Sequence, residues 1–185
     1  MKKKILLLAA VTLLGFPFLA VFINYLISDT QITLLEPSDW NIFLQILLGL
    51  IFGYISAFFC VTLIRTEYMK PVLNKYLPLI KSFQLHVYEI VFISFCAGFG
   101  EEVFFRGFLQ NYFGVIITAF IFVALHGYLD PRNLKISIYG ILMLLIITLI
   151  GYMKVYVGLI GCIAAHTMID IVLFYFLTFK IDFNE

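Results

Sequence analysis

Two glutamates and an arginine stand close together inside an otherwise apolar part of the sequence. Glu101 and Glu102 are adjacent, Arg106 follows, and the residues on both sides are strongly apolar. An ionisable side chain at the centre of a membrane costs about 3 kcal/mol or more, so such groups usually face a polar interior. On a helix, Glu102 and Arg106 stand at i and i+4 and can pair, whereas Glu101 points about 100° away. We expect Arg106 to orient Glu102, which leaves Glu101 free for chemistry.

Two histidines and an aspartate lie deep in the apolar runs that follow. Counted at about 1.5 Å per residue from the nearest predicted turns, Glu101, His126 and His166 all lie roughly 17–18 Å below the outer ends of their helices. Asp170 follows His166 at i+4, on the same helical face. A lone histidine in such a helix is more often a packing residue, but four unrelated packing residues would have no reason to share one level. We predict that these four side chains meet in one site.

The chemistry open to this group is hydrolysis by activated water. An apolar surrounding disfavours the charged form of a carboxylate and so makes it a better base near neutral pH. A histidine beside it can share the proton, and a second histidine held by the carboxylate at i+4 can donate to an oxyanion. No serine or cysteine is placed beside these histidines, so a covalent acyl-enzyme is not indicated. Attack of water on an amide, driven by Glu101, is the simplest reaction that uses all the parts.

The composition is that of an integral membrane protein. Of the 185 residues, 63% are hydrophobic and 12% are charged, whereas soluble domains carry about 25% charged residues. The net charge of +1 gives no basic stripe that could follow the phosphates of a nucleic acid. The three cysteines, Cys60, Cys96 and Cys162, are widely spaced in apolar runs. They predict neither a disulfide framework nor a thiolate metal site.

The apolar runs predict an all-α, polytopic membrane bundle of about six transmembrane helices with its active site inside the membrane. The basic segment 65–86 contains Pro71 and Pro78, which should break any long helix, and we expect it to lie at the interface. We divide the chain into an N-terminal part, 1–86, with two spans, and a four-helix catalytic core, 87–185. The predicted spans are 5–27, 41–64, 87–112, 115–129, 136–152 and 155–179.

The basic residues predict the orientation of the bundle. With the N-terminus in the cytoplasm, only Lys154 of the twelve basic residues lies outside, and Arg106 is within the membrane. This asymmetry is what the positive-inside rule requires. We therefore expect a multi-pass protein of the cell membrane with both termini in the cytoplasm.

Three short patterns, in order, resemble the motifs of the CPBP intramembrane proteases. They are Glu101-Glu102-x-x-x-Arg106, Phe122-x-x-x-His126 and His166-x-x-x-Asp170. Each of the last two is weak alone, but the three together on successive membrane helices are specific. The resemblance covers about half of the chain, and the small residues before the last motif (Gly158, Gly161, Ala164 and Ala165) also look like the family and allow close helix packing. The family includes the CAAX prenyl endopeptidases and the bacterial Abi, or bacteriocin-processing, proteins.

The resemblance implies a glutamate-dependent endopeptidase that needs no metal or cofactor. In that family the first glutamate and the histidine of the second motif activate water, which points to Glu101 and His126. The histidine of the third motif and its partner four residues on stabilise the oxyanion, which points to His166 and Asp170. Glu102 joins this set as a residue that shapes the site.

Asp170 departs from the family, which often has asparagine at this position. An ionised aspartate cannot donate a hydrogen bond to an oxyanion. Asp170 is therefore either protonated in its apolar setting or acts by orienting His166. The chain is also short for the family, so helices that gate the substrate are expected to be missing.

The expected function is hydrolysis of a peptide bond in a membrane-associated peptide or lipidated protein, with the lipid bilayer as a partner and no nucleic acid. Both CAAX-type cleavage and the processing of bacteriocins or pheromones fit. A zinc protease using Glu101, His126 and His166 is one alternative. Bacteriocin self-immunity by binding alone is another, and a proton-coupled transporter is a third, although no inverted repeat is visible.

Overall fold

The computed structural model describes residues 1–28 and 33–181, and in these ranges all regular structure is helical. A chain in hydrocarbon must satisfy its backbone hydrogen bonds internally, and a helix does so within one segment. The predicted all-α class is confirmed. The elements are α1 (Lys2–Ile27), α2 (Ile42–Ile64), α3 (Lys70–Ser82), α4 (Val87–Phe104), the π-helix η1 (Phe105–Leu109), α5 (Gln110–Leu125), α6 (Leu134–Tyr156) and α7 (Leu159–Phe179).

The described residues form five segments that are long and apolar enough to cross a membrane, and one of them contains a turn. This segment, Val87–Leu125, joins α4, η1 and α5 over 39 residues. Gly114 has a φ of 72°, which glycine adopts without steric cost, and the chain reverses there as predicted. The arm 115–125 is only about 16 Å long at 1.5 Å per residue, about half of a 30 Å hydrocarbon core. The predicted fourth span is therefore a short return arm, and it ends at His126 inside the bundle.

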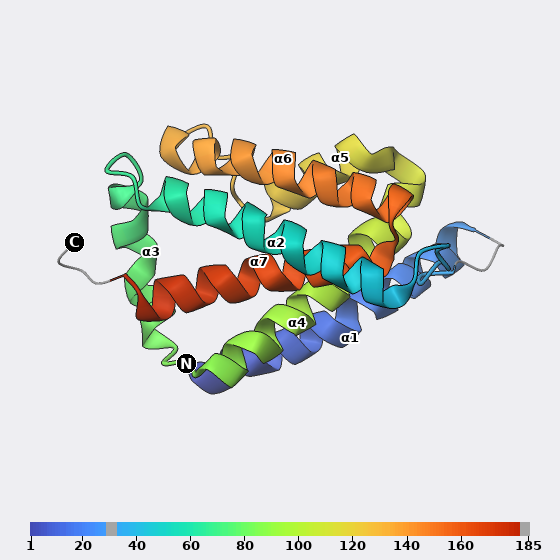
Figure 1. Ribbon diagram of the computed structural model, residues 1–185, viewed down its shortest axis with the longest axis horizontal. Coiled ribbons are helices and arrows are strands. Elements are labelled where there is room, and N and C mark those ends of the chain that lie inside the picture. Colours follow the sequence, from blue (N-terminus) through green and yellow to red (C-terminus); the bar gives the residue numbers. More distant parts are fainter. Residues whose placement is uncertain (29–32, 182–185) are drawn as a thin grey trace.

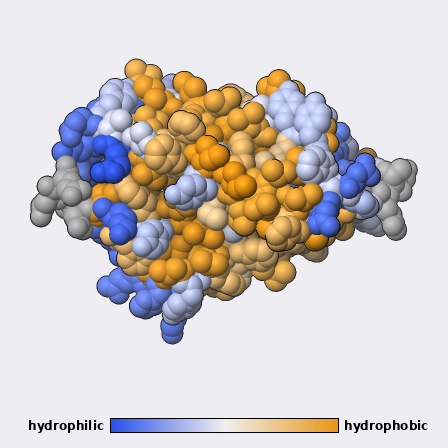
Figure 2. Space-filling view, viewed as in Figure 1, coloured by the Kyte–Doolittle hydropathy of each residue, from blue (hydrophilic) through white to orange (hydrophobic). Residues whose placement is uncertain are grey.

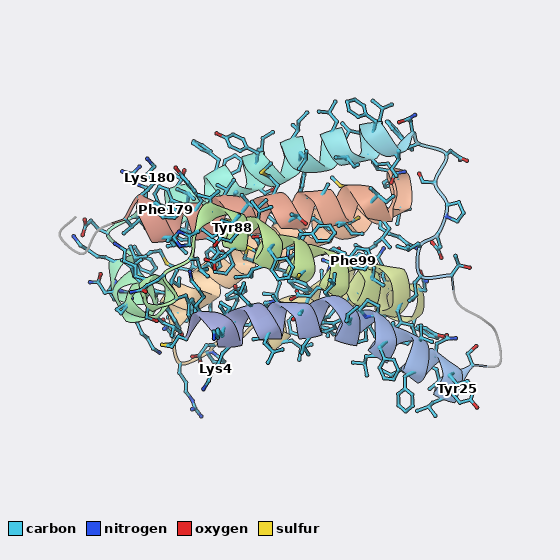
Figure 3. All side chains as sticks on the ribbon, turned by 90° about the horizontal axis from the view of Figure 1, so that it is seen from below. Lys4, Tyr25, Tyr88, Phe99, Phe179 and Lys180 are labelled. Carbon is cyan, nitrogen blue, oxygen red and sulfur yellow. The ribbon has the colours of Figure 1, made fainter. Side chains whose placement is uncertain are left out.

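The long helices run side by side, and α3 lies across one end of them (Figure 1). The start of α1, the end of α2 and the end of α7 all lie at the α3 end. Figure 3 shows Lys4 and Lys180 at this end and Tyr25 at the other. The surface is hydrophobic in the middle and hydrophilic at both ends (Figure 2). The chain is thus a multi-pass membrane protein.

Helix α3 differs in one respect from the sequence-based expectation. Pro71 occupies the first turn, where a backbone N–H has no helical partner anyway, and the 13-residue helix begins there. Pro78, however, lies inside the helix and does not end it. The expectation that both prolines break the segment was wrong for Pro78, and α3 remains one short helix at the end of the bundle.

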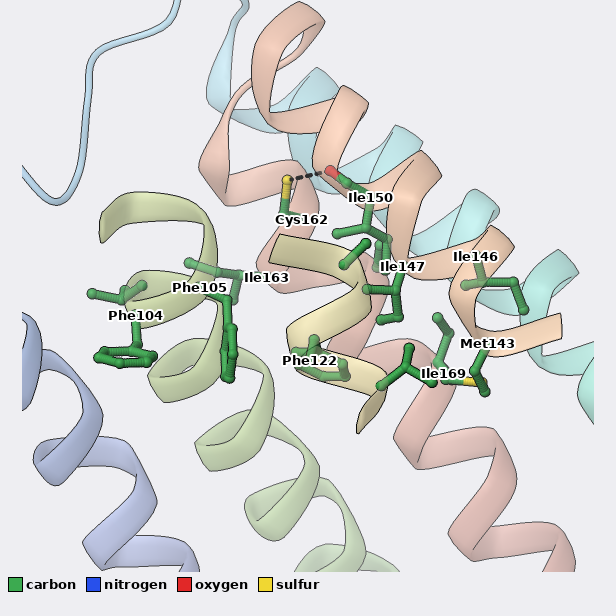
Figure 4. Close-up of a cluster of buried hydrophobic side chains, with 14 of the residues drawn as sticks. Phe104, Phe105, Phe122, Met143, Ile146, Ile147, Ile150, Cys162, Ile163 and Ile169 are labelled. Atoms are coloured by element: carbon green, nitrogen blue, oxygen red, sulfur yellow. Dashed lines mark hydrogen bonds between the residues drawn. The ribbon is translucent and has the colours of Figure 1, made fainter. Parts of the chain in front are cut away.

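Helices α2 and α7 pack closely because small residues face each other. A Cβ atom added to Gly53 would collide with the backbone oxygen of Ala165, and one added to Gly49 would collide with the oxygen of Gly161. The predicted close packing of the small residues that precede His166 is confirmed, and its partner helix is α2. On its other side, α7 contributes Cys162, Ile163 and Ile169 to the hydrophobic core that it shares with α4, α5 and α6 (Figure 4).

Candidate functional site

The acidic motif lies where α4 passes into a π-helix. Glu101 and Glu102 are in the last turn of α4, and Arg106 is in η1. Arg106 Nε lies 3.0 Å from Glu102 Oε2, and both side chains are buried, with exposed fractions of 1% and 0%. The predicted pairing of Glu102 with Arg106 is confirmed. The π-helix itself was not predicted; such one-turn insertions in α-helices are frequent at functional sites.

His166 is held by Glu102 rather than by Asp170. The Nδ1 atom of His166 lies 2.8 Å from Glu102 Oε1, whereas its Nε2 atom is 3.7 Å from Asp170 Oδ2, beyond hydrogen-bond distance. Asp170, expected to hold His166 from i+4, thus lies at ion-pair distance, while the hydrogen bond to the ring is made with Glu102. Asp170 lies on α7 together with His166, and its short side chain does not come within hydrogen-bond distance of the ring. Glu102 reaches His166 from α4, across the interface between the two helices.

Glu101 and His126 form a second pair, separate from the first. His126 Nδ1 lies 2.7 Å from the carbonyl oxygen of Phe122. A carbonyl oxygen only accepts hydrogen bonds, so Nδ1 carries the proton and Nε2 of the neutral ring is a bare acceptor. This Nε2 atom lies 3.4 Å from Glu101 Oε2, without hydrogen-bond alignment. One proton held between Glu101 Oε2 and His126 Nε2 would turn this contact into a hydrogen bond.

Phe122 is the packing centre of both pairs. Its ring stacks on His126 at a centroid distance of 4.2 Å and meets His166 edge-on at 5.7 Å. The guanidinium carbon of Arg106 lies 4.8 Å from the centre of the same ring, a distance typical of a cation–π contact. The first residue of the Phe122-x-x-x-His126 pattern therefore has a physical role, because it fixes both imidazoles and the arginine.

A cavity of about 290 Å³ brings together four of the predicted residues. Glu101 and His126 line it from one side, and His166 and Asp170 line it from α7. Glu102 does not line it and lies behind His166. The predicted meeting of the four side chains at one level is thus present in the structure. Helix α1 adds apolar wall residues, among them Ile5 and Leu8.

Tyr128 also lines this cavity, and the sequence reasoning missed it. It lies two residues after His126, beyond a glycine, where a turn back towards the site could have been read from the sequence. No three His, Cys, Asp or Glu side chains of residues 1–28 and 33–181 are grouped so that they could hold a metal ion. The zinc alternative on Glu101, His126 and His166 therefore has no support in the geometry.

Comparison with known families gives a match over this part of the chain. Residues 83–172 match the model described as type II CAAX prenyl endopeptidase Rce1-like. Over these residues the chain is similar to the CAAX protease family. The part that matches this family runs from just before α4 into α7 and contains all three motifs, while α1 and α2 lie outside it. No curated protein and no solved structure matches the chain significantly. This similarity supports a membrane-embedded hydrolase of peptide bonds in general.

Proposed function

We propose that the protein is an intramembrane endopeptidase that hydrolyses a peptide bond of a membrane-associated peptide or lipidated protein, with water activated by Glu101. The observation that carries this proposal is the tautomer of His126. Its Nδ1 proton is committed to the carbonyl oxygen of Phe122, which turns the bare Nε2 towards Glu101 in the cavity. Such a pair can take up one proton and return it, as general acid–base catalysis requires.

The reaction needs one water and no covalent enzyme intermediate. Glu101 takes a proton from the water, and the water oxygen forms a bond to the carbonyl carbon of the substrate. The π electrons of that carbonyl move to its oxygen, which becomes an oxyanion. The oxyanion then re-forms the C=O bond as the C–N bond breaks, and the leaving nitrogen takes the proton held by Glu101 and His126. The products are a carboxylic acid and an amine.

His166 and its partners support the oxyanion in this scheme. Because His166 directs Nδ1 to Glu102, only Nε2 faces the cavity. Nε2 can donate a hydrogen bond only in the imidazolium form. Two carboxylates, Glu102 at 2.8 Å and Asp170 at 3.7 Å, lie where they favour that positive form. Arg106 in turn compensates the charge of Glu102.

We also propose an orientation of the protein in the membrane and a division of the chain into two parts. The basic ends of α1, α3 and α7 lie together, which supports a cell-membrane orientation with both termini in the cytoplasm. We propose 87–185 as the catalytic core and 1–86 as the supporting part, although α1 contributes to the cavity wall. CAAX-type cleavage and the processing of bacteriocins or pheromones both remain within this substrate class.

The deciding experiment compares peptides in membranes from cells that express the wild-type protein, Glu101→Gln or Glu67→Gln at equal levels. Glu67 is an exposed control, with 86% of its side chain accessible. We expect a set of cleavage products with the wild-type protein and Glu67→Gln that is absent with Glu101→Gln. Cleavage that persists in Glu101→Gln would overturn the proposal, as would identical peptides in all three. Bacteriocin immunity that survives Glu101→Gln would favour the binding alternative.

A further inference from the structure

Tyr128 is directed into the site by the way α5 ends. His126 is the C-cap residue that follows Leu125, and Gly127 comes next with a φ of 72°. The backbone N–H of Gly127 donates to Ala124 O at 3.0 Å, and that of Tyr128 donates to Val123 O at 3.3 Å. These two bonds define a Schellman motif, in which a left-handed glycine reverses the chain. Tyr128 therefore does not continue along the helix but turns back to line the cavity beside His126.

The ring of Tyr128 is fixed, while its hydroxyl is uncommitted. The ring lies 5.7 Å from His126 and meets Tyr139 edge-on at 5.2 Å, as centroid distances. No residue of the described ranges accepts a hydrogen bond from the hydroxyl. A tyrosine hydroxyl keeps its proton near neutral pH, so the hydroxyl of Tyr128 can donate a hydrogen bond.

When the histidines are neutral and the carboxylates are ionised, the other polar side chains of the cavity have no free hydrogen-bond donor. Thr12 donates its hydroxyl to Leu8 O at 3.0 Å. His126 donates Nδ1 to Phe122 O, and His166 directs Nδ1 to Glu102. The carboxylates of Glu101 and Asp170 accept hydrogen bonds when ionised and donate none. The Tyr128 hydroxyl can thus donate a hydrogen bond into the cavity whether His166 is neutral or an imidazolium.

We propose that Tyr128 is a further catalytic residue, whose hydroxyl donates a hydrogen bond to the carbonyl oxygen of the cleaved peptide bond as that oxygen becomes an oxyanion. The inference rests on the proposed hydrolysis at Glu101. The Tyr128 hydroxyl supplies the hydrogen-bond donor that Asp170, as a carboxylate, cannot supply. Because the hydrogen bond strengthens as negative charge develops, Tyr128 acts mainly on the transition state and little on substrate binding.

The experiment measures Tyr128→Phe, which removes the hydroxyl and keeps the ring. The matched control is Tyr139→Phe, because Tyr139 is the neighbouring buried tyrosine and interacts with Cys60 outside the cavity wall. The substrate is a fluorogenic peptide that spans the cleavage site found by the membrane comparison. We expect kcat to fall by about 100-fold for Tyr128→Phe, as for the loss of one oxyanion donor, with KM within about 3-fold of wild type.

The outcomes of this experiment distinguish failure of the role of Tyr128 from failure of the proposed hydrolysis at Glu101. If Glu101→Gln is inactive while Tyr128→Phe keeps wild-type kcat, or loses activity only through KM, the role of Tyr128 is refuted and the protease proposal stands. An equal loss of kcat in Tyr139→Phe also refutes the role of Tyr128, because the effect would then be one of packing. If Glu101→Gln cleaves normally, the proposed function itself fails. Unfolding curves of the purified variants in detergent must coincide with wild type for the kinetic comparison to count.

Discussion

The Nδ1 atom of His166 donates a hydrogen bond of 2.8 Å to Oε1 of Glu102, which lies 64 residues earlier in the chain. Glu102 holds Arg106 through its other oxygen at 3.0 Å. Its neighbour Glu101 faces the cavity and His126 instead. Two adjacent glutamates therefore take part in two separate pairs, and their substitution should have different consequences.

Glu102→Gln should destabilise the fold. The substitution leaves the buried Arg106 guanidinium without its countercharge, which costs about 3–5 kcal/mol. Unfolding of the purified protein in detergent, followed by circular dichroism against temperature, measures this effect.

Glu101→Gln is the matched control for that stability experiment. Glu101 contacts the Glu102–Arg106 pair only through the backbone that it shares with Glu102. The free energy of unfolding of Glu101→Gln should therefore lie within about 0.5 kcal/mol of that of wild type. Equal destabilisation by the two substitutions would contradict the division of the motif into a structural and a chemical acid.

Asp170→Asn should retain most of the activity. Asp170 Oδ2 lies 3.7 Å from His166 Nε2 and does not hold the ring, whereas asparagine adds an N–H donor on the cavity side. We expect product formation within about 10-fold of wild type, since one weak charge contact is replaced by a neutral donor. His166→Asn is the comparison and should be inactive. A complete loss in Asp170→Asn would show that the charge of Asp170 is essential.

Phe122→Ala should lower both stability and activity. The side chain is buried and contacts both imidazoles and the arginine, so its removal leaves a cavity at a cost of about 3–5 kcal/mol. Thermal unfolding and the rate of product formation measure the two effects. Phe58→Ala is the control, because Phe58 is 61% exposed on the surface of α2. A Phe122→Ala protein with wild-type unfolding would argue against this packing role.

Gly53→Ala should weaken the contact between α2 and α7. The added Cβ meets the backbone oxygen of Ala165, which cannot move without shifting the helix, and overpacking of this kind costs about 1–3 kcal/mol. Gly15→Ala is the control, because its Cβ meets nothing nearer than Val11 at 3.8 Å. That change should be neutral or stabilise α1 by less than about 1 kcal/mol. Equal unfolding temperatures for the two variants would speak against the close crossing.

Cysteines placed at the two ends of α6 should react from opposite sides of the membrane. Tyr156 and Leu134 are each 70% exposed, and the native cysteines are all buried. In intact cells, an impermeant maleimide should label Tyr156→Cys and should label Leu134→Cys only after permeabilisation. The reverse pattern would invert the orientation predicted from the basic residues.

Much of the fold and of the site follows from local properties of the sequence. The apolar runs, the turn at Gly114 and the i,i+4 pairing of Glu102 with Arg106 each depend on residues close together in the chain. Helical rise is regular, so counting residues from a turn also predicted that Glu101 and His126 share a level. The structure places these two side chains 3.4 Å apart.

Only the tertiary structure decided which partner each group meets across the helices. The rotation of α7 against α4 brings His166 to Glu102, although Asp170 is its nearer neighbour in sequence. The reversal after Gly127 turns Tyr128 into the cavity. Helical periodicity specifies the face on which a residue lies, but not which residue of another helix it meets. That contact depends on the packing of small residues such as Gly53 against Ala165 and on the rings around Phe122.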